Sequence, residues 1–223
     1  DFAALAHTVV AGNQYLADWA APYARRLSII PTCVDTELFA PMPALDRDGP
    51  VVVGWSGSAS TLEHLRPLLP VLERLKARFG RRVAVRVMGD PAFVHPPLDL
   101  VGEAWSLDAE LALLRRMDIG VMPLPEDPWT RGKCGLKGLV AMSVGAATVM
   151  SPVGVNADIV DEGVNGFTAR SDDEWLEVLS RLVEDAALRA RVGAAGRQTV
   201  TDRYSVSRWA PVLADVLDAS ARR

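Results

Sequence analysis

The sequence predicts an α/β protein in which a mainly parallel β-sheet lies between layers of helices. From residue 51 onward, short runs of β-branched residues alternate with stretches in which leucine recurs at helical spacing. Hydrophobic residues make up 49% of the 223 residues and charged residues 23%, which is typical of a globular chain with a full core. These patterns favour one covered sheet over a disordered or fibrous chain.

Strands and helices are expected to alternate through this region. The expected strands, some with the loop that follows, are 51–55, 83–89, 98–101, 118–125, 147–154 and 162–169. Helices are expected after caps at Ser60, Ser106 and Ser171, and glutamate follows the first and last of these by three positions, as in a capping box. Pro67 and Pro70 should divide the first helix. The other expected helical segments are 133–143, a turn near residue 158 and 205–221.

The first fifty residues have a different organisation. A strand at 8–12, a helix at 13–23 and a strand at 27–32 precede a segment rich in proline and aspartate. These elements are too few for an independent sheet. We therefore expect 1–32 to be the remnant of an N-terminal domain, 33–50 to be an interdomain linker, 51–204 to be the main domain, and 205–223 to be a C-terminal helix.

Composition excludes several classes of function. The net charge of −4 argues against a broad face that binds nucleic acid. Cys33 and Cys134 are too far apart to form a metal motif, and His7, His64 and His95 lie near no nucleophile pattern. We therefore assign no metal site and no catalytic base. No apolar run reaches the roughly 20 residues of a membrane helix, and no signal peptide is visible, so we expect a cytoplasmic protein.

A glycine- and serine-rich turn follows the strand at 51–55. In open α/β sheets, ligands bind beyond the carboxyl ends of the strands. Gly57 and Ser58 in this turn, GWSGSAST, offer small side chains and backbone N–H groups to an anion. An ordinary turn between a strand and a helix explains the same residues equally well.

The segment TRGKCGLK is the second candidate for anion binding. Arg131 and Lys133 stand at the start of the helix expected at 133–143, and Lys137 follows Lys133 by four positions on the same face. The helix dipole opposes cations at this end, so the arrangement costs stability unless an anion lies between them. The helix is apolar beyond the lysines, and we therefore favour diphosphate binding over a solvated basic face.

Two other places could contact the rest of such a ligand. Val155 and Asn156 follow the strand at 147–154 and could present a backbone N–H and an amide to a ribose or phosphate, although a simple turn with asparagine as cap remains an equal alternative. Trp105 could flank a nucleobase. A tryptophan of the core is the preferred interpretation of that residue.

Four segments occur in a characteristic order from about residue 9 onward. They are IIPTCVDTELFAP, VVVGWSGS, DIGVMPLPEDPWTRGKCGLKGLVAMSVG and SPVGVNADIVDEGVNGFTA. Together they resemble the C-terminal donor-binding domain of family 4 (group 1) glycosyltransferases of the GT-B fold. The chain departs from the family pattern in two places. The two glutamates that often flank the donor-site helix are replaced here by Gly132 and Val140. The basic residues that often follow the first strand are replaced by SGSAST.

The resemblance implies both fold and function. It implies a Rossmann-like sheet forming the C-terminal half of a GT-B fold, with a last helix that crosses to a missing N-terminal acceptor domain. It also implies transfer of a hexose, with retention, from a UDP-, GDP- or ADP-hexose to a glycan, lipid or small-molecule acceptor. No cofactor or obligatory metal is implied. Any peripheral membrane contact would fall to the missing domain, and this chain alone would be incomplete for turnover.

These implications include a place in polysaccharide or cell-envelope synthesis. The alternative is a catalytically inactive binding or scaffolding domain of the same fold, which the replacement of the two glutamates suggests. A nucleotide-sugar epimerase of related fold is a weaker alternative.

Overall fold

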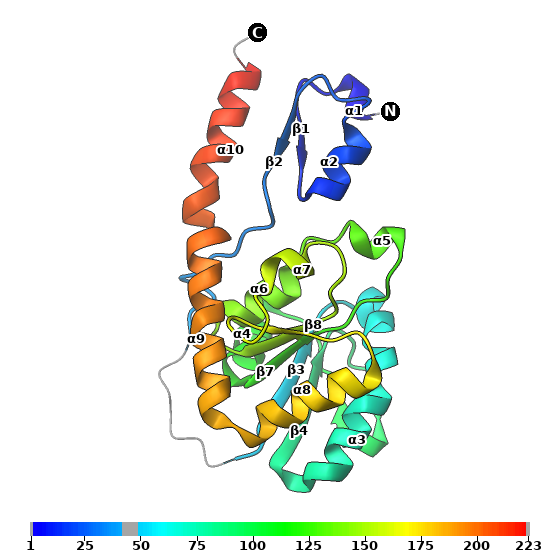
Figure 1. Cartoon of the computed structure of the whole chain (residues 1–223). Coiled ribbons are helices and arrows are strands. Elements are labelled where there is room, and N and C mark those ends of the chain that lie inside the picture. Colours follow the sequence, from blue (N-terminus) through cyan, green and yellow to red (C-terminus); the bar gives the residue numbers. More distant parts are fainter. Residues whose placement is uncertain (1, 42–48, 222–223) are drawn as a thin grey trace.

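A computed structural model describes residues 2–41 and 49–221 of the chain. Its main sheet has five strands in the order β4-β3-β7-β8-β9, and every neighbouring pair is parallel (Figure 1). The strands are β3 (Val51–Ser56), β4 (Val83–Met88), β7 (Ile119–Met122), β8 (Ala147–Met150) and β9 (Phe167–Thr168). The predicted α/β class with a parallel sheet is confirmed.

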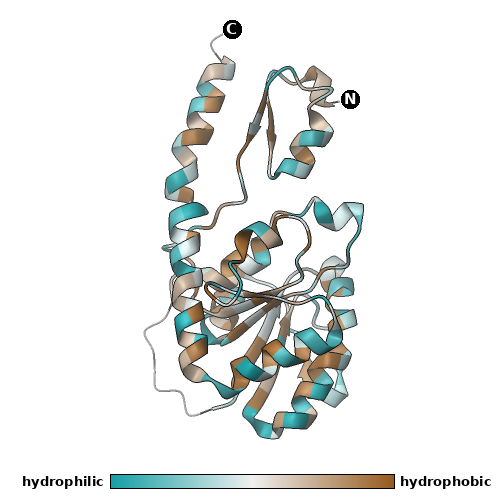
Figure 2. Cartoon of the chain, in the orientation of Figure 1, coloured by the Kyte–Doolittle hydropathy of each residue, from teal (hydrophilic) through white to brown (hydrophobic). Residues whose placement is uncertain are grey.

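Helices cover both faces of this sheet. One hydrophobic cluster packs α3 (Leu69–Phe79) and α8 (Asp172–Glu184) on the strands, with Leu75 and Leu179 fully buried. The other cluster contains residues of α4 (Leu107–Arg116), α6 (Leu136–Ser143) and α9 (Ala186–Arg203). Figure 2 shows hydrophobic residues on the strands and hydrophilic residues on the outer faces of the helices. The sheet is therefore the centre of one layered core.

The segment after β3 differs in detail from the prediction. The two prolines divide it as expected into the 3₁₀-helices η1 (Ala59–His64) and η2 (Arg66–Leu68), followed by α3. The predicted cap at Ser60 is wrong, because Ser60 lies inside η1. Ser58 is the cap, and its backbone N–H donates to Thr61 Oγ1 at 3.0 Å. Threonine three positions after serine completes the same reciprocal pattern as glutamate.

Two more expected elements need correction. The strand expected at 98–101 is shorter, β6 (Leu100–Val101), and pairs antiparallel with β5 (Val94–His95) outside the main sheet; η4 (Pro96–Leu98) joins the two. The helix expected at 133–143 begins only at Leu136, because Gly135 has a left-handed φ of 74°. A short helix, α5 (Pro128–Arg131), lies in the loop before it.

The serine caps of α4 and α8 are confirmed. Ser106 Oγ accepts from Ala109 N at 3.2 Å, and Ser171 Oγ accepts from Glu174 N at 3.2 Å. The turn expected near residue 158 is helix α7 (Asn156–Ile159), and η3 (Gly80–Arg82) joins α3 to β4.

The N-terminal residues form a separate small unit. It contains α1 (Phe2–Leu5), β1 (Val9–Ala11), α2 (Gln14–Ala20) and β2 (Leu27–Ile29), and its two strands pair parallel to each other. The last helix, α10 (Val206–Ala221), runs alongside this unit (Figure 1). Thr8 Oγ1 and Ser220 Oγ are 2.8 Å apart, so α10 leaves the main domain and reaches the N-terminal unit.

Part of the expected linker, residues 42–48, lies outside the described residues. The domain boundaries therefore stay a prediction. Among the helices that the structure describes, none is long and apolar enough to cross a membrane.

Candidate functional site

A cavity of about 500 Å³ opens at the carboxyl ends of β3 and β4. This is the edge at which open α/β sheets bind ligands. Its volume lies in the range of about 300–1,000 Å³ that is usual for small-molecule sites. The lining residues come from the segment after β2, from the end of β3 and the turns after β3 and β4, from the start of α4 and the residue before its cap, and from α6: Cys33, Val34, Asp35, Phe39, Ser56, Gly57, Ser58, Ala59, Gly89, Trp105, Glu110, Leu136, Lys137 and Val140.

The turn after β3 is fixed by close packing of its backbone. Gly57 N donates to Met88 O at 3.2 Å, which ties the turn to the end of β4. A Cβ on Gly57 would lie 2.3 Å from Cη2 of Trp55, and a Cβ on Gly89 would lie 2.7 Å from Gly57 O. Both turns therefore need glycine for space. The predicted anion-binding turn has its backbone at the wall of the cavity.

Lys137 is the cation that the structure places in this cavity. It is the second residue of α6, and its Nζ lies 5.6 Å from the ring centroid of Trp55, which is only 2% exposed. Burial lowers the pKa of Lys137, the charge of Lys133 lowers it further, and Glu110 opposes both. The charged ammonium is therefore incompletely compensated, and an anion in the cavity would stabilise it.

Lys133 lies outside the helix that the sequence predicted for it. It occupies the turn between α5 and α6, so the expected shared helical face with Lys137 is wrong. The two charges are nevertheless close enough to interact, because Lys133 lowers the pKa of both Lys137 and His64. Lys133 Nζ lies 5.8 Å from the ring centroid of Trp129, which is 76% exposed. The Lys133 side chain thus lies over the solvent-exposed ring of Trp129.

Arg131 already has an anionic partner. Its Nε donates to Glu126 Oε1 at 2.6 Å, and both side chains are about half exposed. This ion pair belongs to the loop that carries α5. The backbone of Arg131 is also close to the turn after β8, because a Cβ on Gly154 would lie 2.7 Å from Arg131 O.

Trp105 and Glu110 form one side of the cavity. The core position preferred for Trp105 is wrong, since the residue is 57% exposed. Its Nε1 donates to Glu110 Oε2 at 2.9 Å, and Ser56 Oγ donates to Glu110 Oε1 at 2.7 Å. The carboxylate of Glu110 therefore holds the indole beside the end of β3. A flat, partly exposed ring at this place could stack on a planar ligand.

Glu110 was not among the residues predicted from the sequence, although a signal for it existed. Spacing puts it on the same helical face as Leu107, Leu111 and Leu114. A carboxylate within an apolar stripe indicates a polar partner at that point. The residues of 33–39 carried no comparable signal, because only the tertiary fold brings that segment to the cavity.

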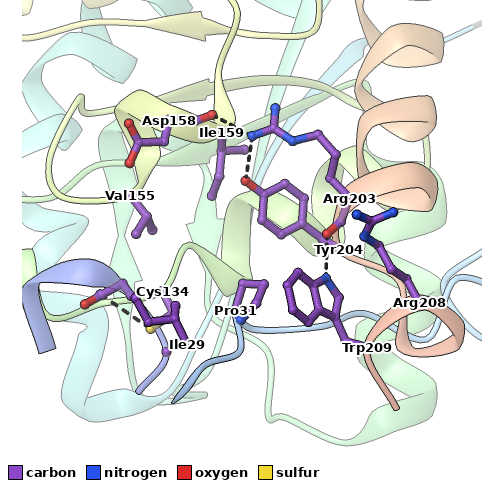
Figure 3. A pocket seen from close by; sticks show the side chains of 12 residues that line it. Ile29, Pro31, Cys134, Val155, Asp158, Ile159, Arg203, Tyr204, Arg208 and Trp209 are labelled. Atoms are coloured by element: carbon purple, nitrogen blue, oxygen red, sulfur yellow. Dashed lines mark hydrogen bonds between the residues drawn. The ribbon is translucent and has the colours of Figure 1, made fainter. Parts of the chain in front are cut away.

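A second cavity, of about 310 Å³, lies between the N-terminal unit, α7 and the junction of α9 and α10. Figure 3 shows Tyr204, Pro31 and Trp209 between two arginines on one side and Val155 and Cys134 on the other. Trp209 Nε1 donates to Arg203 O at 2.7 Å, which fixes the indole at the junction. Of the residues predicted from the sequence to bind a ligand, Val155 lines this cavity.

The residues that the sequence predicts for the site therefore do not all lie in one cavity. Gly57, Ser58, Trp105 and Lys137 share the larger cavity, whereas Arg131, the last residue of α5, and Lys133, in the turn between α5 and α6, do not line it. Asn156 is 1% exposed and donates its amide to Ser151 O at 3.0 Å, as a buried structural residue does. Within residues 2–41 and 49–221, no cluster of three or more His, Cys, Asp or Glu could hold a metal ion.

Comparisons with known proteins identify relatives of this chain. Residues 50–185 match the family model described as "Glycosyl transferases group 1". The D-inositol 3-phosphate glycosyltransferase of Stackebrandtia nassauensis is 28% identical over 225 residues, which cover 87% of this chain and 48% of that protein. The chain therefore spans about half the length of this relative.

Solved structures show the same fold. The HepE protein of Anabaena, in complex with UDP and glucose, superposes with a TM-score of 0.77 at 20% identity, covering 96% of this chain and 63% of that one. In its complex with UDP-glucose the TM-score is 0.75 at 18% identity, with 96% and 64% covered. The expected correspondence to one half of a GT-B glycosyltransferase is consistent with this partial coverage. Because the family model covers most of the chain, the protein belongs to the group 1 glycosyltransferases.

Proposed function

We propose that this chain is the donor-binding part of a glycosyltransferase that moves a hexose from a nucleotide diphosphate sugar to an acceptor. The observation that carries the proposal is the environment of Lys137. A partly buried ammonium, whose pKa is lowered by burial and by Lys133, lies beside a glycine-rich turn in a cavity of about 500 Å³. A diphosphate would supply the negative charge that this environment lacks.

In this proposal the parts of the donor occupy different walls of the cavity. The diphosphate lies between Lys137 and the backbone of the Gly57 and Ser58 turn, within reach of Lys133. The nucleoside extends toward Trp105, whose indole Glu110 holds in place. The hexose then points away from the sheet, toward the second domain that the sequence analysis expects.

UDP is the first nucleotide to test, because HepE, a protein of the same fold, was solved with UDP and with UDP-glucose. Transfer with retention, family 4 membership and a glycan, lipid or small-molecule acceptor are finer parts of the same proposal. So are independence from metals and cofactors, a cytoplasmic location, a role in polysaccharide or cell-envelope synthesis, and peripheral membrane contact by the expected N-terminal domain. The comparisons give the inactive alternative no support, since the relatives described above are glycosyltransferases by name or hold a nucleotide sugar.

Calorimetric titration tests the proposal directly. The chain is titrated with UDP, GDP, ADP and their glucose and mannose conjugates, and a Lys133→Ala, Lys137→Ala double variant is titrated beside it. We expect one nucleotide to bind and the double variant to lose that binding. Arg86→Ala is the matched control, since it removes a positive charge from an exposed position in β4 away from the cavity. Failure of the unchanged chain to bind any of these nucleotides would overturn the proposal.

A further inference from the structure

Asn13 connects the N-terminal unit to the turn that carries Lys133. It precedes α2 and is 3% exposed, although it belongs to a small unit with many exposed apolar residues. Its Oδ1 accepts from Leu16 N at 2.8 Å and so caps α2. That bond uses the acceptor of the amide and leaves its donor for another partner.

The donor group of Asn13 points into the turn between α5 and α6. Nδ2 lies 3.2 Å from Gly132 O, 3.2 Å from Lys133 O and 3.4 Å from Arg131 O. Three successive carbonyl oxygens that converge on one point repel each other unless a donor lies between them. The Asn13 amide supplies that donor, and it comes from a position more than a hundred residues away in the sequence.

The packing around this contact is close. A Cβ on Gly12 would lie 2.5 Å from Cys134 Sγ, and a Cβ on Gly132 would lie 3.3 Å from Leu16 Cδ2. The turn after β8 also approaches this backbone, because a Cβ on Gly154 would lie 2.7 Å from Arg131 O. The backbone at 131–134 is therefore in close contact with both the N-terminal unit and the turn after β8.

We propose that Asn13 is a positioning residue for donor binding, which acts by fixing the turn that orients Lys133. This inference rests on the proposed function, in which Lys133 assists the diphosphate. Because the hydrogen bonds of Asn13 cross from the N-terminal unit to the main domain, donor binding and docking of that unit are coupled. By linkage, a bound nucleotide strengthens the docking as much as the docking strengthens nucleotide binding.

Two substitutions at Asn13 separate its helix-capping hydrogen bond from its hydrogen bonds to the turn that carries Lys133. Asn13→Asp keeps the size and the helix-capping oxygen but replaces the donor with a second acceptor facing three carbonyls. Asn13→Ser keeps a capping hydroxyl and shortens the side chain. We expect each to weaken UDP binding by about fivefold to tenfold, the effect of losing a typical hydrogen bond that fixes a ligand-binding group.

Asn165→Ser is the matched control. Asn165 is also a buried asparagine, whose Oδ1 accepts from Asp161 N at 2.7 Å and whose Nδ2 donates to Ile159 O at 3.0 Å. Its bonds lie within the main domain and do not reach the Lys133 turn. If general loss of stability explained weaker binding, the Asn165 variant would weaken UDP binding in proportion to its own loss of stability, measured by urea unfolding.

A double-mutant cycle identifies the route of the effect. UDP affinity is measured by calorimetry for the unchanged chain, Asn13→Ser, Lys133→Ala and the double variant. If Asn13 acts through Lys133, the double variant binds UDP as weakly as Lys133→Ala alone. This inference is overturned if UDP affinity depends on Lys133 but not on Asn13, or if the losses of UDP affinity from the two substitutions add in the double variant. The proposed function is not affected by either result. No binding by the unchanged chain overturns the proposed function, and this inference falls with it.

Discussion

Replacing Lys137 with methionine should weaken donor binding without lowering the stability of the unliganded chain at neutral pH. Methionine has an unbranched side chain of similar length, and its sulfur can contact the Trp55 ring in place of the ammonium of Lys137. Only the ammonium is removed. The variant therefore separates the charge of Lys137 from its packing.

The expected loss of affinity follows from the role of the ammonium. A hydrogen bond to a charged group contributes about 1.5–3 kcal/mol, and about 1.4 kcal/mol corresponds to a factor of ten. We therefore expect Lys137→Met to weaken UDP binding roughly tenfold to a hundredfold. The charge is partly buried and has the Lys133 charge as a neighbour, so a surface ion pair is the wrong comparison for this estimate.

Stability without nucleotide should not fall at neutral pH. The folded state lowers the pKa of Lys137 from its ordinary value of 10.5, so folding disfavours the protonated form. The penalty is fully present below the folded-state pKa, and it diminishes as pH rises from that pKa toward 10.5. Lys137→Met removes the penalty. The unliganded variant is therefore expected to be at least as stable as the unchanged chain at pH 7, and its stability should rise less in alkaline solution.

Urea unfolding at pH 7 and pH 9.5, together with calorimetric titration with UDP, measures both effects. Arg86→Met is the control, because it removes an exposed charge from β4 and should leave UDP affinity unchanged. The reasoning is refuted if Lys137→Met binds UDP as well as the unchanged chain does. It is also refuted if weaker binding is accompanied by a loss of stability of several kcal/mol, since the lysine would then be mainly a structural residue.

Two further substitutions test other walls of the cavity. Trp105→Ala should weaken UDP binding, measured by calorimetric titration, about tenfold, because a base stacked on an aromatic ring contributes roughly 1–3 kcal/mol. The free energy of unfolding in urea should change little, since the Trp105 side chain is 57% exposed. The control is Trp19→Ala on α2, which is 64% exposed and should leave UDP affinity unchanged. Gly57→Ala should destabilise the fold by about 1–3 kcal/mol in urea unfolding, because its Cβ would lie 2.3 Å from the indole beneath the turn. Gly49→Ala, where a Cβ would meet nothing within 4 Å, should have almost no effect, and equal stability of the two variants would contradict the packing described for this turn.

Much of the main domain could be predicted from local patterns. Buried parallel strands are short and rich in β-branched residues, and Val51–Ser56 and Val83–Met88 show this directly. The serine caps of α4 and α8 could be predicted because each serine and the backbone N–H that it accepts from lie within four consecutive residues. At the site, the same logic found the glycine turn and Lys137, because both follow from the position of a strand end or a helix start.

The remaining features depend on tertiary contacts. The start of α6 moved to Leu136 because Gly135 adopts a left-handed φ, and a Cβ there would also lie 2.4 Å from Ile159 Cδ1. In the sequence Asn13 is only the first residue of an expected helix, and the folded chain shows that it caps α2 and that its amide also donates to the turn carrying Lys133. A core position is the preferred interpretation of Trp105 from the sequence, whereas in the structure its hydrogen bond to Glu110 holds it at the cavity wall.

A crystal structure of the chain with UDP tests the central claim most directly. We expect density for the diphosphate beside Lys137 and the Gly57 turn, with the uracil next to Trp105. Density for UDP in the second cavity, beside Tyr204 and Trp209, would contradict the assignment of the donor site.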